Sequence, residues 1–166
     1  NMALNSKELE ILRIVESDPC ASHEQLATMV DLPVADVKAV LADMRSRGII
    51  LRHHGVINWE KTGEPFVAAL IEVRVTPQRD VGFDAIAQRI ARFPEVRSMY
   101  LVSGTYDLAV YVAGRTMQDV AAFVSSKIAP IDGVQGTVTH FLLKTYKEDG
   151  VLVEGGQPPS RLPIAP

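Results

Sequence analysis

The segment Ser-Gly-Thr-Tyr-Asp at 103–107 places hydroxyl, aromatic and acidic side chains side by side. Gly104 followed by threonine predicts a two-residue type II′ turn, because that turn needs glycine first. Two interpretations of this segment remain open. Asp107 and the tyrosine before it can be ordinary turn residues, or they can form a polar corner that receives the charged ends of an amino acid. Thr137 and Thr139 could add hydroxyl groups there, or could reflect only the preference of threonine for strands.

A second group of residues that could take part in binding is a local excess of basic side chains. Between residues 32 and 56 only two Asp oppose a larger basic set, which comprises Lys38, Arg45, Arg47, Arg52, His53 and His54. The net charge of the chain is −3, so any attraction to DNA must come from this local excess. Adjacent histidines in a strand point to opposite faces, which argues against a metal site there.

Motifs typical of catalysis are absent from the sequence. It holds no Gly-x-Ser-x-Gly, Walker A, Gly-x-Gly-x-x-Gly or His-Glu-x-x-His segment. Cys20 is the one cysteine, which excludes an internal disulfide and a cysteine-based zinc cage. The sequence also has no apolar run long enough to span a membrane, and its first residues lack the charged-then-apolar pattern expected of a secretory signal. We therefore expect a cytoplasmic protein that is not an enzyme, needs no cofactor or metal and does not engage membranes.

Three short helices and a hairpin are predicted for the first half of the chain. Asn5 and Ser22, each followed three residues later by Glu or Gln, mark two helix starts. Pro33 suits the first turn of a third helix, and Gly48 suits its C-terminal cap. The pattern Ile-Ile-Leu-Arg-His-His-Gly-Val-Ile at 49–57 predicts a β-hairpin. This order is typical of a winged helix-turn-helix, which places its last helix in the DNA major groove; a plain three-helix bundle is the alternative.

The second half changes to the two-residue period of strands. Strands are predicted at 66–75, 96–103, 106–112 and 134–145. An amphipathic helix over 83–90 follows the first strand, and a helix that Thr116 can cap follows the third. The order β-α-β-β-α-β is that of a ferredoxin-like domain. The predicted fold class is therefore α+β, a winged helix-turn-helix followed by a ferredoxin-like domain.

The domain boundaries follow from these elements. We expect a DNA-binding domain at 1–60, a linker at 61–65, a ferredoxin-like effector-binding and oligomerisation domain at 66–146, and a C-terminal tail at 147–166. Both helices of the second domain should cover one face of its sheet. The opposite face carries an apolar patch that would be unfavourable to leave exposed to water. Its residues are Phe66, Ala68, Leu70, Tyr100 and Val102. A second sheet would bury them, so the sequence predicts a homodimer.

Over residues 4–146 the chain resembles the Lrp/AsnC family of transcription regulators. In the first half the likeness rests on the Asn5-to-Leu12 start, Ser22-x-x-Gln25-Leu26-Ala27, Leu32, Val37, Leu41, Met44, Gly48 and Ile50. In the second half it rests on Pro94-Glu95-Val96, Ser103-Gly104-Thr105-Tyr106-Asp107, Ile131-Asp132-Gly133-Val134 and Thr137. The Gly-x-Tyr-Asp turn together with Gly-Val before the last strand is the most specific pair.

This resemblance implies a function. It implies a sequence-specific DNA-binding transcriptional regulator whose oligomeric state or DNA affinity responds to a small effector, an amino acid. It also implies an effector (RAM) domain that dimerises through its sheet and assembles into octamers or other rings of dimers. The amino acid would bind between subunits near the Gly-x-Tyr-Asp turn. The effector-binding residues so implied are Ser103, Gly104, Thr105, Tyr106, Asp107, Thr137 and Thr139.

The outward face of the predicted third helix carries Asp36 and Asp43 but no Lys or Arg to pair with guanine. We therefore expect Arg45, Arg52 and the adjacent histidines to contact the DNA backbone more than the bases. The candidate DNA-binding residues are Ser22, Gln25, Ala35, Asp36, Lys38, Arg45, Arg47, Arg52, His53 and His54. Two alternatives stay open: a ligand-sensing or scaffolding oligomer with weak or lost DNA binding, and a small enzyme with its site at the sheet–sheet interface.

Overall fold

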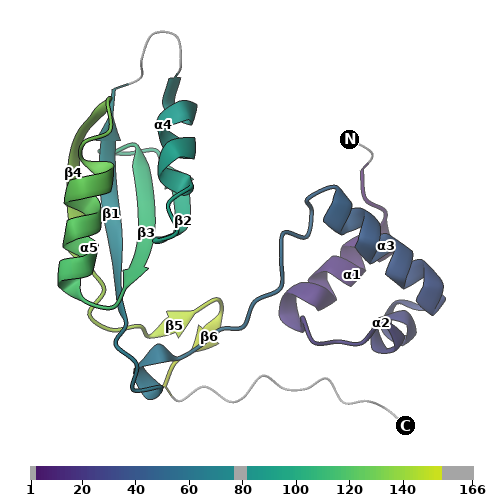
Figure 1. Cartoon of the computed structure of the whole chain (residues 1–166). Helices are drawn as coiled ribbons and strands as arrows, with labels where there is room; N and C mark the ends of the chain where they lie inside the picture. Colours follow the sequence, from purple (N-terminus) through teal and green to yellow (C-terminus); the bar gives the residue numbers. More distant parts are fainter. Residues whose placement is uncertain (1–2, 77–81, 155–166) are drawn as a thin grey trace. The chain divides into compact units, whose positions relative to one another are not determined.

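The chain divides into two compact units between Gly55 and Val56 (Figure 1). The computed structural model describes residues 3–76 and 82–154. Each unit has its own cluster of buried apolar residues. None of the helices in these described ranges has both the length and the apolar character needed to cross a membrane.

The first unit consists of three helices, α1 (Ser6–Ser17), α2 (His23–Val30) and α3 (Val34–Ser46). Both predicted capping boxes are confirmed. The Asn5 side chain accepts from the Glu8 N–H at 2.9 Å, and the Glu8 carboxylate accepts from the Asn5 N–H at 2.8 Å. Ser22 and Gln25 exchange the same two bonds at the start of α2. Reciprocal caps of this kind satisfy N–H groups that a helix start leaves without partners.

A glycine-based stop ends α3, as the sequence predicts. Gly48 has a φ of +68°, and its N–H donates to the Arg45 carbonyl. The Ile49 N–H donates to the Met44 carbonyl at 2.8 Å, which completes a Schellman motif. The helices pack around a small core of Ile11, Leu26, Ala27, Val30, Val37 and Leu41.

The β-hairpin predicted at 49–57 is wrong, because residues 51–58 have no regular secondary structure. The N–H groups of Ile49 and Ile50 both donate to the Met44 carbonyl, so the cap of α3 uses the residues that should begin the first strand. The remaining segment is too short for a stable two-stranded ribbon. Leu51 is 89% exposed as a result.

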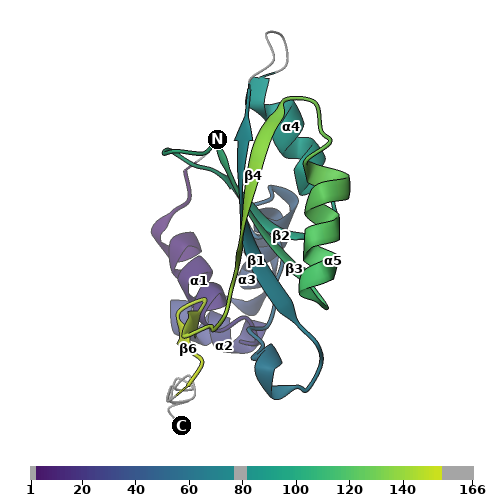
Figure 2. The same ribbon diagram turned by 90° about the vertical axis from the view of Figure 1, so that its left-hand side faces the viewer.

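The second unit is the predicted ferredoxin-like α+β domain. Its elements in chain order are β1 (Val67–Val75), α4 (Gly82–Ala91), β2 (Val96–Leu101), β3 (Leu108–Gly114), α5 (Met117–Phe123), the π-helical turn η2 (Val124–Ile128) and β4 (Val134–Phe141). The sheet order is β2-β3-β1-β4, and every neighbouring pair is antiparallel. Both helices lie on one side of the sheet (Figure 2).

The side chains of the central strand β1 point alternately to the two faces of this sheet. Its inward residues Ala69, Ile71 and Val73 are fully buried beneath the helices, where Ile90 and Ile128 are fully buried too. Burying such an aliphatic side chain contributes roughly 1.5–3 kcal/mol. This side of the sheet holds the core of the unit and fixes the strand register.

We call the other side of the sheet the open face. Cross-strand pairing brings together Ala68, Leu70, Glu72 and Arg74 of β1, Tyr111 and Ala109 of β3, and His140, Val138 and Gly136 of β4. Tyr100 of β2 pairs with Ala109 and is 61% exposed. Val138 is 50% exposed. In the single chain the side chains of Tyr100 and Val138 still meet water, in keeping with the expectation of a partner sheet.

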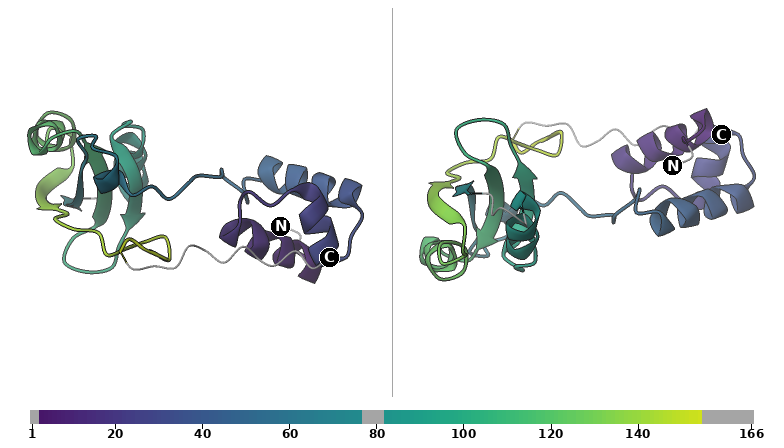
Figure 3. Two further views of the ribbon diagram at one scale, coloured as in Figure 1. Left: turned by 90° about the horizontal axis from the view of Figure 1, so that it is seen from below. Right: turned by 90° about the horizontal axis from the view of Figure 1, so that it is seen from above.

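Two short elements flank the sheet. The turn η1 (Trp59–Lys61) precedes β1, and the Trp59 ring stacks on Phe66 with centroids 5.7 Å apart. Strands β5 (Lys147–Glu148) and β6 (Val151–Leu152) pair as a small hairpin on the side opposite the helices (Figures 2 and 3). The predicted tail is thus partly ordered; its remainder, 155–166, lies outside the described residues.

Candidate functional site

The loop at 102–107 joins β2 to β3, and the two-residue turn predicted within it is wrong. Leu101 pairs with Leu108, so six residues form the connection. The Val102 N–H donates to the Asp107 carbonyl at 2.9 Å, while the Asp107 N–H donates to the Val73 carbonyl at 3.1 Å. These bonds tie the end of the loop to β1 and widen the turn. Gly104 has a φ of +153° and open space where a side chain would start.

The Asp107 side chain has a structural role. The strand register shifts between Arg74 and Val75, which frees the Val75 N–H from the regular ladder. Asp107 Oδ2 accepts from that N–H at 2.8 Å. Within the described residues no bond is found for its second oxygen. The bond to the Val75 N–H attaches the end of the loop to β1 through the Asp107 carboxylate.

Thr137 and Thr139 lie on β4, on the other side of β1. They pair with Val73 and Ile71, so both belong to the half-buried, helix-covered side of that strand. Thr137 thus lies at the same end of the sheet as the 102–107 loop, separated from it by β1. Thr139 is one step further from that end.

The sequence did not reveal a hollow on the open face at this end of the sheet. The hollow has a volume of about 170 Å³ and is lined by Glu72, Arg74, Gly136, Thr137 and Val138. Arg74 is exposed and pairs across the strands with Gly136. Glu72 Oε1 lies 3.0 Å from His140 Nε2. The sequence shows that Glu72 and Arg74 lie two residues apart, and therefore on one face of the predicted strand. That Gly136 lies opposite Arg74 is known only from the strand register.

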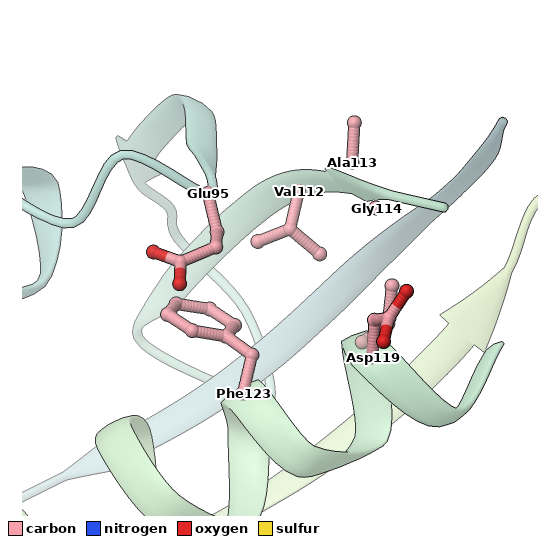
Figure 4. Close-up of a pocket in the computed structure, with 7 residues that line it drawn as sticks. Glu95, Val112, Ala113, Gly114, Asp119 and Phe123 are labelled. Atoms are coloured by element: carbon pink, nitrogen blue, oxygen red, sulfur yellow. The ribbon is translucent and has the colours of Figure 1, made fainter. Parts of the chain in front are cut away.

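A smaller pocket of about 100 Å³ lies between α5 and the end of β3, beside Glu95, which precedes β2 (Figure 4). Lys127 of η2 donates to Glu95 Oε1 at 2.5 Å and stands over the rings of Phe93 and Phe123. The hydrogen bond from Lys127 is the main cause of the lowered pKa of Glu95. Ligand pockets usually measure several hundred Å³, so this pocket is too small for a typical ligand. The Lys127–Glu95 ion pair beside it links η2 to the residue before β2.

All ten candidate DNA-binding residues are exposed. Ser22 and Gln25 are also engaged in the cap of α2. Arg47 Nη1 pairs with Asp43 Oδ2 at 2.9 Å, one turn earlier on α3. The outward face of α3 therefore presents a partly neutralised surface, with Lys38 and Arg45 as its flanking cations.

Tyr111 lies on the open face, and the charge of Glu148 in the β5–β6 hairpin acts on its phenol. Burial raises the pKa of its phenol, and the charge of Glu148 raises it further. The folded protein then holds the phenol proton more tightly than the unfolded chain. This contribution to stability is complete below pH 10.0 and is lost as the pH rises through the folded-state pKa.

Glu148→Gln is therefore expected to lower the pKa of Tyr111 without returning it to its ordinary value, because burial remains. Phenolate absorbance, taken as the difference from Tyr111→Phe, measures it. Glu154→Gln, the same change in an exposed residue paired with Lys144, is the control. An unchanged titration in Glu148→Gln would show that the hairpin does not lie near the open face.

Comparison with known proteins identifies the family. The Lrp/AsnC ligand binding domain matches residues 68–152, which span β1 to β6. The uncharacterized HTH-type transcriptional regulator YugG of Bacillus subtilis is 45% identical over 99% of this chain and 100% of its own. The chain belongs to the Lrp/AsnC family. A further HTH-type regulator of this kind, from Pyrococcus horikoshii, is 28% identical over 87% of this chain and 89% of its own.

Solved structures agree with the Lrp/AsnC fold. The leucine response regulatory protein LrpA of Mycobacterium tuberculosis has a TM-score of 0.74 at 23% identity, over 88% of this chain and 97% of that one. The Neisseria meningitidis regulator solved as an L-Met complex has a TM-score of 0.66 at 21% identity, over 88% and 94% of the two chains. At these identities the likeness concerns the fold. It confirms the predicted class of a helical unit followed by a ferredoxin-like domain.

Proposed function

We propose that this Lrp/AsnC protein is a sequence-specific DNA-binding transcriptional regulator whose assembly or DNA affinity responds to an amino acid. One observation carries the proposal: a capped three-helix unit and a ferredoxin-like unit that matches the family's ligand-binding domain occur in one chain. Its relatives are HTH-type transcriptional regulators, and one related fold was solved with L-Met. No cofactor, metal or catalytic step enters this function, which we assign to the cytoplasm.

We assign the parts as the sequence suggests. The DNA-binding domain comprises residues 1–60, and a linker at 61–65 joins it to the second domain. The second domain, residues 66–146, binds the effector and oligomerises, and residues 147–166 form a C-terminal tail. The proposed homodimer buries the open face against a second copy, and dimers can then join into octamers or other rings. The proposed effector-binding residues are Ser103, Gly104, Thr105, Tyr106, Asp107, Thr137 and Thr139.

The DNA-binding surface that we propose is α3 with the residues after it. Its members are Ser22, Gln25, Ala35, Asp36, Lys38, Arg45, Arg47, Arg52, His53 and His54. Because Asp36 and Asp43 lie on the outward side of α3, most contacts of this set should go to phosphates. Phosphate contacts hold the protein on any duplex, and sequence preference then comes from fewer contacts to bases.

Arg45→Ala and Arg52→Ala are each expected to weaken binding to a mixed-sequence duplex. Each phosphate contact releases about one counterion, so the salt dependence should flatten by about one unit in each variant. Fluorescence anisotropy over a salt series measures both quantities. Arg13→Ala, at an exposed arginine of α1, is the matched control. Wild-type affinity at low salt in both variants would reject this surface.

A second function is favoured by the acidic outward face of α3. In it the protein is a ligand-sensing or scaffolding oligomer whose DNA binding is weak or lost. The same titration separates the two functions: a wild-type protein that binds no duplex at low salt supports the scaffold. Calorimetric screening of the twenty amino acids tests the effector, which both functions share.

A further inference from the structure

A lysine of the first helix binds the turn between α2 and α3. Lys7, in the first turn of α1, donates from Nζ to the Val30 carbonyl at 2.6 Å and to the Asp31 carbonyl at 2.7 Å. These partners lie 23 and 24 residues further along the chain. Val30 ends α2 and Asp31 is its C-terminal cap, so one side chain joins the start of α1 to the end of α2.

The end of α2 needs such a partner. Its last turn contains no basic residue, although the carbonyls at a helix end lack partners within the helix and carry partial negative charge. Asp31 also has a left-handed backbone with a φ of +51°, which costs more in aspartate than in glycine. The Lys7 ammonium makes charge-assisted hydrogen bonds to both carbonyls and thereby favours the conformation that presents them together.

The start of α3 depends on this turn. The helices α1, α2 and α5 each begin with a capping box, whereas Pro33 at the start of α3 makes no side-chain hydrogen bond. Leu32 and Pro33 are the two residues between Asp31 and the first residue of α3. The N–H groups of Asp36 and Val37 donate to the Pro33 carbonyl at 3.0 and 3.1 Å. The direction of α3 therefore follows from the conformation of the turn before it.

We propose that Lys7 is a positioning residue for DNA binding. Its two bonds hold the turn that aligns α3, which is the main element of the proposed DNA-binding surface. Lys7 does not itself contact DNA in this role and is not among the ten residues proposed to do so. The proposal rests on the proposed function, because it concerns how α3 is presented to the duplex.

A positioning lysine and a lysine that contacts phosphate differ in their dependence on salt. Each phosphate contact releases about one counterion, so its loss flattens the salt dependence by about one unit. Loss of a positioning residue lowers the fraction of molecules with an aligned α3, and the apparent affinity falls in proportion to that fraction. The number of phosphate contacts in the bound complex stays the same, so the salt dependence does not change.

The test compares Lys7→Met with Arg13→Met in the full chain. Methionine keeps an unbranched apolar side chain and a similar helix propensity, so the change is confined to the charge and its donors. Arg13 is an exposed residue of the same helix, and its replacement removes an equal charge. Fluorescence anisotropy with a mixed-sequence duplex over a salt series measures the affinity and its salt dependence. Thermal melting fixes a temperature at which both variants are folded.

Lys7→Met should weaken binding about tenfold with an unchanged salt dependence, because two charge-assisted hydrogen bonds no longer hold the aligned turn. Lys7→Arg should restore most of the affinity, since a guanidinium can also donate to two carbonyls. Arg13→Met should bind like the wild type.

Amide hydrogen exchange separates this role from a general effect on stability. In Lys7→Met the N–H groups of Asp36 and Val37 should exchange faster, because the first turn of α3 loses its support. The Leu26 N–H, which donates to the Ser22 carbonyl at the start of α2, should keep its rate. Equal acceleration of all three would contradict a role specific to α3.

A second pair of variants serves if Lys7→Met alone does not fold. Asp31→Gly stabilises the end of α2, because glycine adopts the left-handed conformation without strain. Adding Lys7→Met to Asp31→Gly should again weaken binding relative to Asp31→Gly alone, with the same salt dependence.

Three results would overturn the proposal. Wild-type affinity in a folded Lys7 variant would show that α3 is aligned without the lysine, and DNA binding as a function would stand. A salt dependence flattened by about one unit would instead identify Lys7 as a phosphate contact. A wild-type protein that binds no duplex at low salt would reject DNA binding itself, and the positioning role with it.

Discussion

Tyr100→Glu is expected to turn the proposed dimer into a monomer at micromolar concentration. Tyr100 is 61% exposed on the open face, so glutamate there keeps its hydration in the single chain and leaves the fold intact. In the dimer the same carboxylate would be buried without a partner, at a cost of several kcal/mol. Sedimentation velocity across a dilution series measures the change.

Gln88→Glu is the matched control, because it adds the same charge at an exposed position of α4 on the covered side of the sheet. It should sediment like the wild type. If Tyr100→Glu remained a dimer with wild-type stability, the interface would lie elsewhere than the open face. A monomeric wild type would reject the assembly as a whole.

The second large effect concerns two substitutions of one carboxylate. Asp107→Ala removes the acceptor of the Val75 N–H, a bond of 2.8 Å in a partly buried place. Leaving that donor without a partner should lower the free energy of unfolding by about 1–3 kcal/mol. Asp107→Asn keeps an oxygen that can accept the bond, so it should melt close to the wild type.

The same two variants separate stability from effector binding. If Asp107 also faces the ammonium group of the effector, Asp107→Asn should bind the amino acid more weakly while staying folded. Thermal melting followed by calorimetric titration of the same samples gives both values. Equal melting temperatures for Asp107→Ala and the wild type would contradict the structural bond, and equal ligand affinities for Asp107→Asn and the wild type would contradict the ligand contact.

Local chemistry explains which elements the sequence could predict. The caps at Asn5 and Ser22, the stop at Gly48 and the cap at Thr116 depend on residues within one helical turn, and each was found. The β-α-β-β-α-β order follows from hydrophobic periodicity, because each strand and helix must bury one apolar face in the core. Predictions failed where another element took the hydrogen bonds that the predicted turn needed. The cap of α3 at the Met44 carbonyl uses the first residues of the expected hairpin, and the distant strand β1 binds the end of the 102–107 loop.

The candidate site shows the same limit. The Gly-x-Tyr-Asp segment was visible in the sequence, but the bond from Asp107 to β1 depends on a register shift at Arg74 and Val75. The pairing of Arg74 with Gly136 depends on strands from opposite ends of the domain. Sequence spacing cannot supply such pairs, because they exist only once the sheet has aligned.

The two separate clusters of buried residues have a consequence for heating. Unfolding enthalpy scales with chain length, at about 0.7 kcal/mol per residue, so the unit ending at Gly55 absorbs about 40 kcal/mol and the larger unit about 80 kcal/mol. The width of a melting transition varies inversely with its enthalpy. The helical unit therefore unfolds over a wider temperature interval than the sheet unit. Warming would reduce DNA occupancy gradually, while the proposed assembly through the sheet would be lost over a narrow temperature interval.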